Sequence, residues 1–183
     1  MNEKIQNEIR LFNRLLMSYN DFKQAHEIST YLLENKLYES YPAENRTLVI
    51  GLNMAAIVAY SRPFSSNRGA LAQRRIPLDI LDVLTEEERE VHDIVITDRN
   101  TMMAHSDADA NDSFPLVLAT GNSKIVVPMN ASPYANPLLP EAMKVLSEMS
   151  LKLQEEVFDR RQKMEPNLIE HLPVKQAAGT EEA

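Results

Sequence analysis

Two histidines, an arginine and several carboxylates lie between His92 and Asp107, in a segment that otherwise has the apolar spacing of a buried helix. A histidine exchanges protons near neutral pH, and the planar guanidinium of an arginine matches the oxygens of a phosphate. Acid–base chemistry at a phosphate ester needs groups that move protons to and from the reacting oxygens and a cation that stabilises the charge developing on the phosphate. The segment therefore contains the residue types that this chemistry requires.

Helical spacing places these polar groups among apolar side chains. At about 100° per residue, Asp98 and His105 share a stripe with two valines and a methionine, while His92 and Arg99 belong to the adjacent stripe. An unpaired charge in such surroundings is costly, so the groups must be paired or must face a cleft or an interface. One interpretation is structural: Asp98 and Arg99 form ion pairs to other helices, and His105 lies at a helix C-terminus, where cations are favoured.

The stretch "RNTMMAH" has an arginine, then an asparagine, and a histidine after five intervening residues. This pattern resembles the motif of the HEPN superfamily, whose members are helical bundles and include dimeric, metal-independent ribonucleases of toxin-antitoxin and phage-defence systems. The resemblance covers the third predicted helix. It implies that Arg99 and His105 are catalytic, that Asp98, Asn100 and His92 support them, and that no metal or other cofactor takes part.

One copy of this motif makes a poor active site, because Arg99 and His105 point about 120° apart in an ideal helix. Two copies around a two-fold axis, or a frayed last turn, would bring the two side chains together. We therefore expect a homodimer whose interface includes this helix, with RNA as substrate and an antitoxin or another protein as candidate partner. The alternative is a non-catalytic dimerisation, interaction or nucleotide-binding module, in which the same residues serve assembly.

Five further residues are candidates for binding a substrate. Tyr60 and Arg62 lie at the end of the second predicted helix, from which they could reach a phosphate or a base, although an arginine there can simply cap the helix. Arg68, Arg74 and Arg75 fall in the stretch "FSSNRGALAQRRIP", the best local basic patch. The alternative for this stretch is an ordinary solvated loop.

Composition limits the other possibilities. The chain has 183 residues, 44% of them hydrophobic, which suits one globular domain, and it lacks cysteine, which excludes thiolate chemistry. A formal net charge of -8 argues against non-specific nucleic-acid binding, so any contact with RNA needs a local basic site. We expect a cytoplasmic protein without a membrane partner, because the start does not resemble a signal peptide and no window approaches the length of a membrane span.

The predicted fold is mainly α, an up-down bundle of four main helices. The first helix is expected to end near Asn35 and the second to stop before Pro63, because proline disfavours helical conformation in the residue before it. The third is expected to run from a Thr85 cap, in "TEEE", to His105. The last is expected to begin at Pro140.

A small β-hairpin is expected over residues 114–129, where two β-favouring runs flank "TGNS". It would be inserted before the last helix. Residues 1–165 are expected to form a single domain, and residues 166–183 a disordered tail, since they carry little periodic apolar content.

Overall fold

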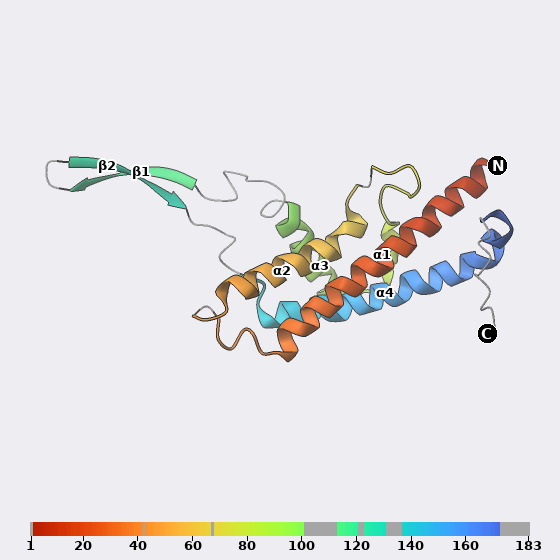
Figure 1. The fold of residues 1–183 in the computed structure, drawn as a ribbon, viewed down its shortest axis with the longest axis horizontal. Coiled ribbons are helices and arrows are strands. Elements are labelled where there is room, and N and C mark those ends of the chain that lie inside the picture. Colours follow the sequence, from red (N-terminus) through yellow and green to blue (C-terminus); the bar gives the residue numbers. More distant parts are fainter. Residues whose placement is uncertain are drawn as a thin grey trace, which may run out of the picture.

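The computed structural model describes residues 2–41, 43–66, 68–100, 113–120, 123–130 and 137–172. It confirms a mainly α fold with four long helices and a small antiparallel hairpin before the last of them (Figure 1). The long helices are α1 (Glu3–Glu34), α2 (Arg46–Ser61), α3 (Glu86–Asp98) and α4 (Pro140–Leu168). Short 3-10 turns lie between α2 and α3, as η1 (Arg62–Phe64) and η2 (Leu78–Val83), and after α4, as η5 (Ile169–His171).

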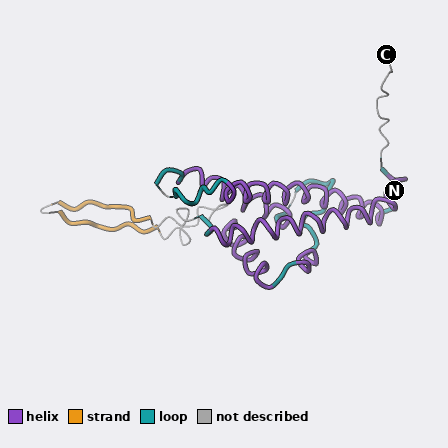
Figure 2. Tube along the Cα trace, turned by 90° about the horizontal axis from the view of Figure 1, so that it is seen from below, coloured by secondary structure: helices purple, strands orange, loops and turns teal. Residues whose placement is uncertain are grey.

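Helices α1 and α4 run antiparallel along the length of the bundle, and α2 packs beside α1 (Figures 1 and 2). Buried serines on both long helices, such as Ser29 and Ser150, keep their contact faces small, which allows the helices to approach closely. The core is an apolar cluster drawn from all four helices and η2, and its largest members include Leu15, Phe22, Ile57, Tyr60, Ile80, Leu146 and Leu153.

Helix α2 ends at Ser61, directly before the turn that holds Pro63, as predicted. The expectation that no segment approaches the length of a membrane span is wrong, because the stretch Arg46–Phe64 is long and apolar enough by composition alone. Core packing accounts for that apolar content, since Val49, Ile57 and other side chains of α2 are buried in the bundle.

Helix α3 begins with the predicted cap. The Thr85 hydroxyl accepts a hydrogen bond from the Glu88 backbone, and the Glu88 carboxylate accepts one from the Thr85 backbone. Lys152 of α4 donates to the same carboxylate at 2.6 Å, which ties the start of α3 to the bundle. The α-helical geometry ends at Asp98 and is followed by a wider π-helical turn at residues 99–100. The predicted extension to His105 lies outside the described residues.

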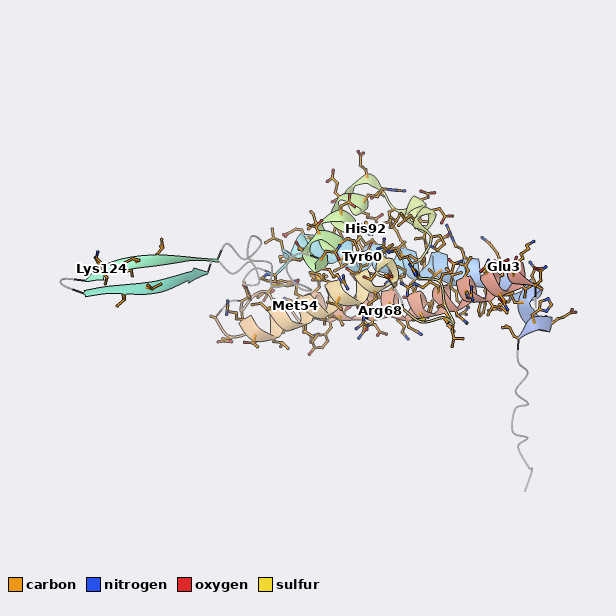
Figure 3. The ribbon with its side chains drawn as sticks, turned by 90° about the horizontal axis from the view of Figure 1, so that it is seen from above. Glu3, Met54, Tyr60, Arg68, His92 and Lys124 are labelled. Atoms are coloured by element: carbon orange, nitrogen blue, oxygen red, sulfur yellow. The ribbon has the colours of Figure 1, made fainter. Side chains whose placement is uncertain are left out.

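The predicted hairpin is confirmed as β1 (Ser113–Thr120) and β2 (Ser123–Asn130), which pair antiparallel. Figures 1 and 3 show it projecting beyond one end of the bundle, with Lys124 towards its tip. Its apolar side chains are exposed on both faces, for example Val117 at 62% and Ile125 at 50%. The hairpin therefore contributes little to the core that positions the rest of the molecule.

The predicted boundary between domain and tail at residue 166 is wrong. Helix α4 runs through Pro166 to Leu168, and the side chain of Leu168 is fully buried. One apolar side chain at the end of a long helix gives too short a pattern to be recognised in the sequence. Residues 173–183, the remainder of the predicted tail, lie outside the described residues.

Candidate functional site

A hollow of about 380 Å³ lies where the end of α2, the following turn and the end of α3 meet. It is lined by Ser61, Phe64, Ser65, Ser66, Arg75, Ile96, Arg99 and Asn100. The motif residues Arg99 and Asn100 therefore share a cavity with Arg75 of the predicted basic loop. The sequence analysis nominated Arg99 and Asn100 in one motif and Arg75 in a separate loop, and it did not place the loop beside the motif.

The lining of this hollow suits an anion. Its lining residues include two arginines, three serines and one asparagine, and no carboxylate is present among the described lining residues. The hydroxyls of Ser61 and Ser65 donate to the backbone carbonyls of Ile57 and Ser61. Arginine guanidiniums are among the side-chain groups that bind phosphate oxygens. The Arg99 Nη1 donates to Asn100 Oδ1 at 2.9 Å, so the neighbouring amide orients the guanidinium of the motif arginine. We call this cavity, with its eight lining residues, the motif pocket.

Arg14 of α1 holds one wall of the motif pocket in place. Its Nη2 donates to the carbonyl oxygens of Arg62 at 2.7 Å, of Pro63, and of Ser65 at 3.2 Å. The side chain is almost completely buried, so three carbonyls of one turn replace the water that its charge would otherwise bind. Sequence reasoning missed Arg14, because nothing in its apolar surroundings on α1 marks it as a contact of a distant turn.

The same turn also fixes the segment that carries Arg75. The carbonyl of Pro63 accepts a hydrogen bond from the backbone nitrogen of Ile76 at 3.0 Å, and the Ile76 side chain is buried. Arg75 is therefore held against the turn by its neighbour in sequence. The serines of the pocket were also missed; the available signal was the run of three serines around the proline that ends α2.

Tyr60 and His92 lie behind the motif pocket, where Figure 3 shows them close together on α2 and α3. The Tyr60 hydroxyl is 2.8 Å from His92 Nδ1, and the His92 ring stacks edge-on against Phe64, with centroids 4.7 Å apart. Tyr60 is fully buried, so the prediction that it reaches a phosphate or a base is wrong. His92 is also buried, and its ring contacts the lining residue Phe64.

Burial sets the protonation of this pair. It lowers the pKa of His92, an effect partly opposed by Asp93, and it raises the pKa of Tyr60 well above the usual value. His92 is therefore neutral and Tyr60 protonated at neutral pH. The consistent arrangement is a Tyr60 hydroxyl that donates to an unprotonated Nδ1 of His92.

The other candidate cations are placed differently. Arg62 Nη1 donates to Asp21 at 3.3 Å and to Gln24 at 2.9 Å, and Arg62 does not line the motif pocket, so its guanidinium serves to join the end of α2 to α1. Arg68 is exposed on the loop after η1 and does not line the motif pocket. Arg74 lines a second hollow, together with Arg10 of α1, and Arg68 does not line that hollow either.

Asp98 and His105 complete the predicted site. Asp98 is partly buried, burial raises its pKa, and no ion pair between described residues includes it, so the structural alternative of a salt bridge within the chain is not observed in the described part. His105 lies outside the described residues. In the described part of the chain, no group of three or more His, Asp or Glu side chains is arranged to hold a metal ion.

Comparison with known proteins adds no relative: no protein-family model, curated protein or solved structure matches this chain.

Proposed function

We propose that the chain is a metal-independent endoribonuclease of the HEPN type that acts as a homodimer. The observation that carries the proposal is the motif pocket, in which Arg99 and Asn100 of the "RNTMMAH" stretch share a lining with Arg75. A phosphodiester in this hollow would lie beside two arginines without a competing carboxylate among the described lining residues.

The reaction is a transesterification within the RNA strand. The 2′-oxygen attacks the adjacent phosphorus, the bond from phosphorus to the 5′-oxygen breaks, and the products are a 2′,3′-cyclic phosphate and a 5′-hydroxyl. A proton leaves the 2′-hydroxyl and another reaches the departing 5′-oxygen. We assign this proton transfer to His105, the titratable member of the motif, and stabilisation of the charged transition state to Arg99 and Arg75.

Asp98 supports a second copy of the chain beside this helix. Its carboxylate lies one residue before Arg99, is partly buried, and has no ion-pair partner in the described part of the chain. A cation from another copy, such as its Arg99, would compensate that charge. Dimerisation would also bring two copies of the motif together, so that Arg99 and His105 from different copies could act on one phosphate.

The test uses purified full-length protein, single-stranded RNA and excess EDTA. The parent protein is expected to cut the RNA and leave 2′,3′-cyclic phosphate ends, whereas His105→Ala and Arg99→Ala should each lower the rate at least about 100-fold. Arg89→Ala is the matched control, because Arg89 is an exposed arginine of the same helix that pairs with Asp82. Cleavage that survives in His105→Ala would reject this mechanism.

The second candidate is a non-catalytic dimerisation module, favoured by an exposed apolar side chain on the same helix. Ile94 of α3 is 51% exposed, one turn before Asp98, and an interface would cover it. In that case neither the parent nor any variant cuts RNA, and Arg99→Ala and Ile94→Ser both shift the protein towards the monomer in light scattering.

A further inference from the structure

A second basic hollow lies next to the motif pocket. Its volume is about 500 Å³, and it is lined by Asn7, Arg10, Gly69, Ala70, Ala72, Gln73, Arg74 and Arg75. Arg75 lines both hollows, so the two are neighbours that share this residue. We call the second cavity, with its eight lining residues, the arginine hollow.

The loop that forms the arginine hollow is attached to the bundle on both sides of its arginines. The backbone nitrogen of Gln73 donates to the Arg10 carbonyl at 3.1 Å, and Asn13 Nδ2 donates to the Leu71 carbonyl at 2.8 Å. The side chains of Ala72 and Ile76, which flank the two loop arginines, are buried. This stretch is therefore packed and hydrogen-bonded against α1. It differs from the ordinary solvated loop that was the alternative interpretation of the sequence.

The arginines of this hollow are not neutralised by the protein. No ion pair between described residues includes Arg10, Arg74 or Arg75, and no carboxylate lines the hollow in the described part of the chain. Other arginines of the bundle, such as Arg62 and Arg160, do pair with carboxylates. In a chain with a formal net charge of -8, three uncompensated guanidiniums at one hollow form a local site for a polyanion.

We propose that the arginine hollow binds the backbone of single-stranded RNA next to the phosphate held in the motif pocket, with Arg75 between two phosphates. The assignment of the strand to RNA rests on the proposed function. The described lining has amides and guanidiniums but no aromatic ring on which a base could stack. Contacts of this kind hold phosphates and carry little sequence information, so the hollow adds affinity without base preference.

The test measures binding of a fluorescent oligoribonucleotide whose 2′-oxygens are methylated, so that it cannot be cut. The double variant Arg10→Ala with Arg74→Ala is expected to bind roughly tenfold more weakly at low salt, and its slope of log affinity against log salt should be smaller by about 1.4, or about 0.7 for each lost phosphate contact. The matched control is Arg46→Ala with Lys163→Ala, which removes the same charge from exposed positions outside both hollows.

Equal weakening in the double variant and its control, an unchanged salt slope, or no binding by the parent would each overturn the proposal. The outcome is separable from that of the proposed function, because no cleavage is measured. A parent that binds through Arg10 and Arg74 but never cuts RNA supports the arginine hollow and refutes the nuclease. If the parent cuts RNA and the double variant binds the oligonucleotide as well as the parent does, the nuclease is supported and the arginine hollow is refuted.

Discussion

Tyr60 and His92 are joined by a hydrogen bond in the interior of the bundle, with the tyrosine Oη 2.8 Å from the histidine Nδ1. The bond links α2 to α3 and lies against Phe64, a lining residue of the motif pocket. Tyr60, predicted to bind a substrate, and His92, predicted to support the catalytic residues, thus satisfy each other's hydrogen-bonding groups in the interior. The consequences for stability are measurable.

Replacing Tyr60 with Phe should lower the free energy of unfolding by about 1 kcal/mol, because the variant keeps the ring packing and loses the hydrogen bond to His92. Urea denaturation followed by circular dichroism measures the change. Tyr31→Phe is the control, since Tyr31 is 51% exposed on α1 and its substitution should change stability by no more than about 0.5 kcal/mol. An equal effect of the two substitutions would contradict the buried bond.

The lowered pKa of His92 predicts a loss of stability in mild acid. Burial disfavours the charged ring, so the unfolded chain takes up a proton near pH 6.5 while the folded protein takes it up at lower pH. The stabilising effect of the neutral ring is full above about pH 6.5 and declines as the pH falls towards the folded pKa. Unfolding measured across this window should show the decline in the parent protein and a flatter profile in His92→Gln, which cannot titrate. Parallel profiles would rule out His92 as the source.

Arg14 should be among the most sensitive positions for folding. Substitution by Met keeps much of the side-chain volume but removes the charged donor shared by the carbonyls of Arg62, Pro63 and Ser65, of which the first two keep a backbone donor. We expect a loss of about 2–3 kcal/mol in unfolding free energy. Arg10→Met, on the exposed side of the same helix, should cost about 0.5 kcal/mol or less. Similar losses in the two variants would show that the contacts of Arg14 to the turn are not what stabilises this region.

The cap of α3 gives a local prediction. Thr85→Ala should lower the free energy of unfolding by about 1 kcal/mol, because the backbone nitrogen of Glu88 loses its acceptor. Thr85→Ser keeps the hydroxyl and should retain most of that stability. Both variants lose the methyl group of the threonine, and only the alanine variant loses the hydroxyl. Comparing their thermal denaturation therefore isolates the contribution of the capping hydrogen bond. A serine variant as unstable as the alanine variant would argue against the capping bond.

The features that sequence reasoning predicted correctly depend on short-range interactions. The "TEEE" cap at Thr85, the end of α2 before Pro63 and the hairpin over residues 114–129 are each encoded by neighbouring residues. The boundary at residue 166 and the surface role of Tyr60 were wrong, because both depend on what packs against those residues from elsewhere in the chain.

The residue types available for chemistry can be read from the sequence alone, namely the arginine and asparagine directly after α3 and the loop with two adjacent arginines. Only the tertiary structure shows that Arg75 and Arg99 line one hollow, and that Arg14 donates a hydrogen bond to the carbonyl of Pro63, 49 residues further along the chain. The difference lies in how far apart along the chain the contacting residues are. A cap or a turn is a contact between residues a few positions apart, whereas a pocket forms only where the packing of α1, α2 and α3 fixes their relative positions.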